Sequence, residues 1–342
     1  MTYRLPASLI TAALLVSSLS GCGSKSNAAA SANGKEVSEL RYQGAANTVT
    51  LAELAQDLGY FGTIKLKWVG NTISGPQDIQ SAATDQTDFG GAFTGAVVKL
   101  VEAGAPVKAV IDYYGEDAKT FNGVYVKADS SIHSPRDLLG KKIAVNTLGA
   151  HYEALIDTYL ARNGLSAEEI KQVQLVVLPP NSTEEAIRKG QVDAGILGGV
   201  LQDNAIAVGG LRSLFNDFQL FGAFNGGQYV LRTAFIKQNP TVSKTFVNAI
   251  AKAIEWERTT PRDQVIDEFT KIITARGRNE STATLKYWKS VGVATKGGQI
   301  RDSDFTQWSE WLNKSGIVHG TLTPSKYYTN ELNTFAAGNG NE

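Results

Sequence analysis

The sequence predicts an α/β protein with mostly parallel sheets flanked by helices, and two observations carry this prediction. From about residue 39, short runs rich in β-branched and aromatic residues alternate with segments of helical periodicity. The second is an internal repeat, in which similar motifs recur at one constant spacing. Gly44-Ala45 is repeated as Gly149-Ala150, and Gln86-Thr87-Asp88-Phe89-Gly90 corresponds to Gln191-Val192-Asp193-Ala194-Gly195. We expect a βαβ unit used twice, the alternative being coincidence between two generic α/β units.

The individual elements follow from local patterns. Strands are expected at 39–43, 63–69, 107–113, 124–128, 142–146 and 174–178. Between them, leucine and alanine residues share one helical face at 51–58, and Ser134-Pro135 reads as an N-cap followed by a proline in the first turn. Ser182 and Glu185 predict a capping box before a helix that ends near Lys189. Beyond Asn239-Pro240, long helical segments dominate.

An amino-terminal leader is predicted from Arg4, from the apolar run 7–19 and from Cys22, the only cysteine. The run is too short to span a bilayer. Its order resembles the lipobox of bacterial lipoproteins, in which the cysteine carries a lipid. We therefore expect a signal peptide at 1–22, a flexible linker at 23–37 and a lipid-anchored, extracytoplasmic body. The alternative is an ordinary signal peptide with an incidental cysteine.

The composition excludes several classes of function. Of the 342 residues, Lys+Arg and Asp+Glu number 33 each, which gives no electrostatic case for a nucleic-acid partner. The three histidines, His133, His151 and His319, are too scattered for a known metal motif, and no phosphate-binding glycine loop follows a strand. We expect no cofactor, no metal and no catalytic residue.

An ordered set of motifs resembles the solute-binding proteins of ABC importers for nitrate, taurine and aliphatic sulfonates. The resemblance covers about 39–255 and rests on Arg41-Tyr42-Gln43, Ser74-Gly75-Pro76-Gln77, Asp88-Phe89-Gly90-Gly91-Ala92-Phe93-Thr94-Gly95, Ala105-Pro106-Val107-Lys108-Ala109-Val110, Ser134-Pro135-Arg136-Asp137-Leu138-Leu139-Gly140-Lys141-Lys142, Ala161-Arg162-Asn163-Gly164-Leu165 and Gly190-Gln191-Val192-Asp193-Ala194. It implies a two-lobed periplasmic-binding-protein fold of type II, whose lobes close on a ligand.

Two hinge crossings are expected where glycines interrupt the pattern, near 114–122 and near 225–227. Lobe I then combines 38–117 with 228–335, lobe II is 122–224, and 336–342 is a tail. Ligands in such lobes sit beyond the carboxyl ends of the strands, against the amino termini of the following helices.

The predicted ligand site consists of loop residues rich in small and neutral polar side chains, which allow close backbone approach. Its candidates are Gln43, Gly44, Asn47, Ser74, Gly75, Phe93, Thr94, Asn146, Thr147, Gly149, His151, Gly198, Gly199 and Arg232. Several have a structural alternative. Gln43 is suited to bond a neighbouring backbone group, and Phe93 to belong to the core. Asn47, Ser74 and Thr94 are suited to cap helices, His151 to a helix surface and Arg232 to a strand end.

The sequence departs from the sulfonate-binding pattern at Gly198-Gly199, where family members commonly carry an aromatic and an acidic residue. We expect a wider wall there, which favours an organic sulfonate, taurine or a sulfate ester over nitrate. The predicted function is capture of a small oxoanionic solute by a monomer and its delivery to a membrane permease. The alternatives are a binding protein for a thiamine-precursor pyrimidine, an aromatic acid or nitrate. An enzyme on the same fold, such as a pyrimidine synthase or a hydroxymethylbilane synthase, is disfavoured because those enzymes need cysteines that this chain lacks.

Overall fold

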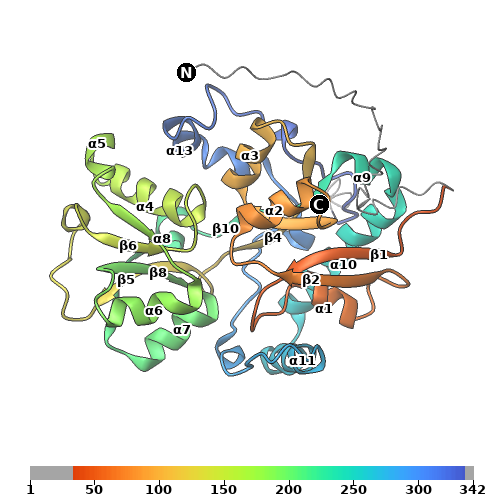
Figure 1. Cartoon of the computed structure of the whole chain (residues 1–342), viewed down its shortest axis with the longest axis horizontal. Coiled ribbons are helices and arrows are strands. Elements are labelled where there is room, and N and C mark those ends of the chain that lie inside the picture. The colour runs from red at the N-terminus through yellow and green to blue at the C-terminus, as the bar shows by residue number, and fades with distance from the viewer. Residues whose placement is uncertain (1–33, 336–342) are drawn as a thin grey trace, which may run out of the picture.

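The computed structural model describes residues 34–335 (Figure 1). The predicted signal peptide with Cys22, most of the predicted linker and the predicted tail lie outside these residues. The described chain forms the following elements: β1 (Glu39–Gly44), α1 (Leu51–Asp57), β2 (Lys65–Asn71), α2 (Gly75–Ala83), β3 (Phe89–Phe93), α3 (Thr94–Glu102), β4 (Val107–Glu116), β5 (Asn122–Lys127), η1 (Pro135–Leu138), β6 (Lys142–Val145), α4 (His151–Arg162), α5 (Ala167–Ile170), β7 (Gln174–Val177), α6 (Pro180–Arg188), β8 (Ala194–Gly198), α7 (Gly199–Val208), β9 (Leu211–Asn216), α8 (Asp217–Phe221), β10 (Phe224–Arg232), α9 (Thr233–Gln238), α10 (Pro240–Thr259), α11 (Arg262–Ala275), η2 (Leu285–Tyr287), η3 (Lys296–Gly298), α12 (Asp302–Thr306), α13 (Ser309–Lys314) and η4 (Pro324–Lys326).

The elements gather into two halves. One half contains a five-stranded sheet in the order β7-β6-β8-β5-β9, with α4 to α8 around it. The other contains a two-stranded sheet, β1-β2, and a three-stranded sheet, β3-β10-β4, with α1 to α3 and the carboxyl-terminal helices (Figure 1). The two-lobed α/β architecture expected from the sequence is confirmed.

The expectation of mostly parallel sheets holds only in part. Strand β6 is parallel to β7 and β8, and β1 is parallel to β2. However, β5 runs antiparallel to β8 and β9, and β10 runs antiparallel to β3 and β4. Both exceptions are strands that the chain enters directly after passing from one half to the other. Such a strand arrives without a crossover helix, which a parallel neighbour in the same sheet requires.

All six strands expected from the sequence are present within a few residues of their expected ends. The helix starts are less accurate. The helix expected after Ser182 begins at Pro180, with Pro179 as its N-cap, so Ser182 lies inside the first turn. A proline at the first helical position needs no amide donor and starts the helix earlier than the capping box suggested. Ser134 does cap a turn with Asp137, but that turn is a single 3₁₀ turn.

The internal repeat corresponds to two equivalent hydrogen-bond arrangements. Asp88 precedes β3, and its carboxylate accepts the backbone N–H of Arg41 in β1 at 2.6 Å. Asp193 precedes β8, and its carboxylate accepts the backbone N–H of Lys142 in β6 at 2.9 Å. In each unit the aspartate N–H also donates to the carbonyl of the same β1 or β6 residue. Each Asp-x-Gly aspartate therefore connects the third strand of its βαβαβ unit to the first.

The glycines of the two Asp-x-Gly motifs serve close packing of a helix on a strand. A Cβ on Gly90 would overlap the backbone of Asp78 in α2, and a Cβ on Gly195 would overlap Thr183 in α6. Side chains larger than hydrogen would therefore push each helix off its sheet. This explains why the motif recurs at equivalent positions in the two units.

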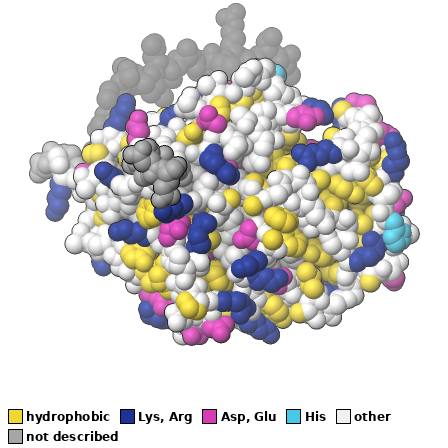
Figure 2. Space-filling view, turned by 180° about the vertical axis from the view of Figure 1, so that it is seen from behind, with side chains coloured by type: hydrophobic (Ala, Val, Ile, Leu, Met, Phe, Trp, Pro, Cys, Tyr) yellow, Lys and Arg dark blue, Asp and Glu magenta, His cyan; other side chains and the backbone are white. Residues whose placement is uncertain are grey.

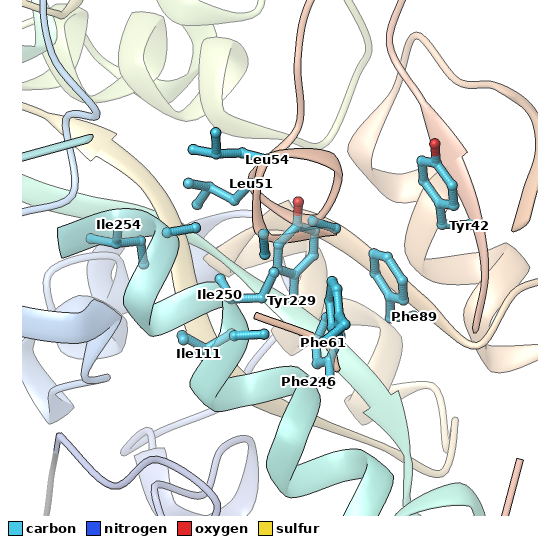
Figure 3. Packing of buried hydrophobic residues seen from close by; sticks show 14 of the residues in the cluster. Tyr42, Leu51, Leu54, Phe61, Phe89, Ile111, Tyr229, Phe246, Ile250 and Ile254 are labelled. Carbon is cyan, nitrogen blue, oxygen red and sulfur yellow. The ribbon is translucent and has the colours of Figure 1, made fainter. Parts of the chain in front are cut away.

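The main hydrophobic core lies between α10 and the sheet β3-β10-β4. Phe89 is central to it: its ring lies 4.5 Å from that of Phe246 in α10 and meets the ring of Tyr229 edge-on at 5.4 Å (Figure 3). Ile250 and Ile254 continue the buried face of α10. The five-stranded sheet has a separate core, which includes Val124, Ile143 and Leu155. Each half therefore buries apolar residues of its own.

One buried acid in α10 links stability to pH. Burial raises the pKa of Glu257 to about 8 from its ordinary value of 4.5. The unfolded chain releases this proton near its ordinary pKa, whereas the folded chain keeps it until about pH 8. The contribution of Glu257 to the free energy of unfolding therefore falls as the pH rises from its ordinary pKa of 4.5 to about 8. The fall is at most about 1.4 kcal/mol per pH unit.

We expect Glu257→Gln to stabilise the protein at pH 7.5 by about 2–3 kcal/mol and to have little effect at pH 4. Urea unfolding at the two pH values measures the difference. Glu331→Gln, at an exposed position, serves as the control and should change neither value. An equal effect of Glu257→Gln at both pH values would contradict the assignment.

The surface carries charges of both signs. On the face seen in Figure 2, basic and acidic side chains are interspersed. Within residues 34–335, no helix combines the length and hydropathy needed to cross a membrane.

Candidate functional site

A cavity of about 310 Å³ lies where the two halves meet. One side consists of Gly75 and Pro76 at the start of α2, Ala92 and Phe93 at the end of β3, and the end of β4. The other side comes from the β6–α4 loop, from the first residues of α4 and from Gly199 at the start of α7. This volume suits a small organic molecule.

Four helices begin at the cavity. The wall includes Gly75 in α2, Phe93 directly before α3, His151 in α4 and Gly199 in α7. The first N–H groups of a helix have no partner within the helix and carry a partial positive charge. Among the described residues that line the cavity, none is a lysine or an arginine. The wall can therefore bind an anion through backbone amides without a cationic side chain.

Aromatic rings cover much of the remaining wall. The imidazole of His151 stacks on Phe93 at a centroid distance of 5.3 Å, and Tyr113 and Tyr114 meet edge to face at 5.0 Å. Tyr152 completes this group at the start of α4. Burial lowers the pKa of His151 to about 3, so the imidazole is neutral at physiological pH. The rings provide an apolar surface for the body of a ligand.

Two buried carboxyl groups lie close together beside the cavity, and one of them, Glu116, is part of its lining. Glu116 ends β4, and burial together with nearby carboxylates raises its pKa well above the ordinary value. Asp217 begins α8, and burial raises its pKa to about 6. The amide of Asn122 donates to both, at 2.5 Å to Glu116 and 3.0 Å to Asp217.

The structure places six of the residues predicted from the sequence on the cavity wall: Gly75, Phe93, Asn146, Thr147, His151 and Gly199. His151 is buried rather than lying on a helix surface. Its burial follows from its place at the start of α4, which faces the other half.

The other eight candidates do not line this cavity. Three lie in the adjoining segments: Ser74 and Gly149 each stand one residue before a lining residue, and Thr94 follows Phe93. The hydroxyl of Thr94 donates to the carbonyl of Gly226 and accepts from the amide of Gln228. Ser74 precedes α2 without capping it through its side chain.

Gln43, Gly44 and Asn47 lie at the carboxyl end of β1. The side-chain oxygen of Gln43 is buried and has no hydrogen-bond partner. Gly44 faces Trp68 and Arg278. Asn47 does not cap α1, which Thr50 caps in a box with Glu53; instead the Asn47 side chain accepts the N–H of Ser281 at 2.7 Å.

The remaining two candidates have structural partners. Arg232 forms a 2.7 Å ion pair with Asp85 and donates to the carbonyls of Ala82 and Thr87. The space that a side chain at Gly198 would need is occupied by the amide of Asn122. The wider wall expected from Gly198-Gly199 can therefore arise only at Gly199.

Several lining residues were absent from the predicted site, notably Glu116, Asn122 and Tyr152. Glu116 and Asn122 lie at the predicted hinge 114–122, at the base of the cavity. Gly115, which interrupts the strand pattern, indicated that the chain crosses between the lobes there. Residues at such a crossing also lie at the bottom of the cleft between two lobes, and this could have identified Glu116 and Asn122 as candidates.

Comparison with known proteins agrees with this fold. A Bacillus subtilis (strain 168) protein, whose name assigns it provisionally to the binding of aliphatic sulfonates, is 27% identical over 256 residues, covering 73% of this chain and 74% of the relative. The alkanesulfonate-binding protein SsuA of Xanthomonas axonopodis pv. citri, solved with bound MOPS, superposes with a TM-score of 0.67 at 19% identity, over 86% of this chain and 99% of that one.

Two further solved structures show how widely the fold is used. The periplasmic nitrate-binding protein NrtA of Synechocystis PCC 6803 has a TM-score of 0.65 at 13% identity, over 88% of this chain and 89% of that one. The desulfurization enzyme DSZB has a TM-score of 0.56 at 16% identity, over 86% of this chain and 97% of that one. These likenesses confirm the periplasmic-binding-protein fold, and the fold alone does not decide between binding and catalysis.

Residues 48–264 match the NMT1/THI5-like family. This match spans more than half of the sequence and includes residues from both halves of the structure. The resemblance inferred from the ordered motifs is thereby confirmed, and the chain belongs to the NMT1/THI5-like family.

Proposed function

We propose that this protein is an extracytoplasmic solute-binding lipoprotein of an ABC importer, which captures a small organic oxoanion between its lobes. The observation that carries the proposal is the meeting of four helix amino termini at a cavity whose lining lacks lysine and arginine. Such a wall stabilises a negative head group through backbone amides. The B. subtilis relative and SsuA, both named for sulfonate binding, support a sulfonate as the solute.

The proposed lobes are 38–117 with 228–335, and 122–224. The pairing of β5 to β9 within a single sheet supports this division. The two connections, after β4 and before β10, act as hinges, and the solute contacts both lobes. Because a ligand that binds across the cleft favours the closed arrangement, binding shifts the population toward the form that a permease would receive. A lipid on Cys22 holds the monomer at the membrane.

The proposed contacts are divided between the lobes. Gly75 and Phe93 in lobe I, and Asn146, Thr147 and Gly199 in lobe II, surround the head group, while Tyr114 and Tyr152 cover the apolar body. The amide of Asn146 and the hydroxyl of Thr147 add neutral donors. No step in this account makes or breaks a covalent bond.

A thermal-shift screen followed by calorimetry tests the proposal. A ligand that binds only the native state raises the unfolding midpoint. We expect alkanesulfonates, taurine or alkyl sulfates to do so, with one site per chain, and nitrate to bind more weakly. Binding of nitrate alone would contradict the organic oxoanion, and turnover of any of these compounds would contradict the binding role.

A second candidate solute is favoured by the aromatic wall. The rings of Tyr114 and Tyr152 can stack on a planar heterocycle such as a thiamine-precursor pyrimidine. Such a ligand would change the intrinsic fluorescence of the protein, whereas sulfonates would cause no change. The same screen, extended to pyrimidines, separates the two candidates.

A further inference from the structure

Three metal-ligating side chains from separate segments converge at the junction of the two halves. Glu116 comes from the end of β4, His151 from the first residue of α4 and Asp217 from the first residue of α8. One ligand atom from each lies within 4.8 Å of the others, and all three residues are buried. Segments far apart in the sequence thus bring one imidazole nitrogen and two carboxylate oxygens close together.

The imidazole nitrogen of this cluster has no hydrogen-bond partner. His151 is only 5% exposed, and its Nε2 atom is buried without a hydrogen bond. The same atom lies 3.5 Å from Oδ2 of Asp217. Two ligands of a tetrahedral metal ion, each about 2.1 Å from it, lie about 3.4 Å apart, so this pair already has a suitable separation.

The two carboxyl groups also lack a balancing charge. Within the described part of the chain, no lysine or arginine forms an ion pair with Glu116 or Asp217. Burying two carboxylates side by side is costly unless they take up a proton or meet a cation. A divalent cation between them would neutralise both charges at once.

Neighbouring groups hold these ligands in place. The amide of Asn122 donates to both carboxyl groups, and its own oxygen accepts the hydroxyl of Tyr152 at 3.1 Å. The second oxygen of Asp217 accepts the N–H groups of Asn122 and Phe218, at 2.9 and 2.8 Å. The stacked ring of Phe93 fixes the plane of the imidazole. Outer contacts of this kind orient ligands in metal sites.

We propose that Glu116, His151 and Asp217 form a site for one divalent transition-metal ion of the zinc type. A mixed nitrogen and oxygen ligand set suits Zn²⁺ and its first-row neighbours, whereas Ca²⁺ and Mg²⁺ prefer oxygen ligands alone. Glu116 and His151 also line the cavity, so a remaining coordination position faces its interior. All three proposed ligands come from the protein, so metal binding can be tested without any solute.

Metal titration of the untagged, chelator-treated full chain tests this site without any solute. We expect one equivalent of Zn²⁺ to bind and to raise the unfolding midpoint, and Co²⁺ to give the visible absorption of a nitrogen- and oxygen-ligated ion. His151→Gln and Asp217→Asn should each lower the affinity for Zn²⁺ at least tenfold. His133→Gln and His319→Gln change exposed histidines outside the cluster and should bind Zn²⁺ as the native protein does.

The folding of each variant is checked before its affinity for Zn²⁺ is compared with that of the native protein. Circular dichroism identifies a variant that fails to fold, and the remaining variant then carries the comparison. Absence of stoichiometric Zn²⁺ and Co²⁺ binding to the native protein would overturn the proposal, as would unchanged affinity in a folded His151→Gln variant. Because no solute is present, failure of the proposed oxoanion function leaves this result unaffected.

Discussion

Replacing Asp88 by alanine should lower the free energy of unfolding by about 3 kcal/mol, because the change removes the buried carboxylate that two arginines share and leaves them the more exposed Asp85 and backbone carbonyls. The Asp88 carboxylate is 5% exposed and accepts the backbone N–H of Arg41 at 2.6 Å and its guanidinium at 2.7 Å. It also lies 3.5 Å from the guanidinium of Arg232. Loss of the carboxylate therefore removes a link between β1, β3 and β10.

Asp193 provides the matched control, since it occupies the equivalent position in the other half. Its carboxylate accepts the backbone N–H of Lys142, but the residue is exposed and has no arginine partner in the described chain. Asp193→Ala should cost only about 1 kcal/mol. Urea unfolding of both variants measures the difference, and equal losses would show that the arginine contacts contribute nothing.

Thr147→Asp should weaken oxoanion binding about 100-fold. Thr147 lines the cavity beside the start of α4, so an aspartate places a negative charge close to the proposed head group. Two like charges about 5 Å apart repel by about 3 kcal/mol at an effective dielectric constant near 20, and each 1.4 kcal/mol is tenfold in affinity. Calorimetry with the best sulfonate from the screen gives the ratio.

Thr147→Asn matches the aspartate in size without its charge, and its affinity should fall far less. If both variants weaken binding equally, the effect is steric and the electrostatic argument fails. If Thr147→Asp binds the native solute more tightly, that solute is not an anion.

The strands and the duplicated unit could be predicted from the sequence because they depend on local patterns. The run at 39–43 predicts a strand and the paired Asp-x-Gly motifs predict a repeated unit. The structure has that strand, and the aspartates of the two motifs form equivalent hydrogen bonds. The start of α6 could not be predicted as accurately, since Pro180 and Ser182 both favour a helix start and the proline lies earlier.

The site was harder to predict because its members meet only through the arrangement of the two halves. Arg232 has a sequence position near a hinge, yet its guanidinium points to Asp85 and Asp88, acids that lie far from it along the chain. Gly198 was expected to open the wall, but Asn122 from another strand fills that space. The cluster of Glu116, His151 and Asp217 has no local spacing that reveals it.

The most direct test of the account compares an alkanesulfonate with the methyl alkyl sulfone of the same chain length, which keeps two of the three oxygens on sulfur, has a methyl group in place of the third and carries no charge. If helix amino termini hold a negative head group in the cavity, calorimetry will show the sulfonate binding at least 100-fold more tightly than the sulfone. Equal affinities, or a preference for the sulfone, would contradict this account.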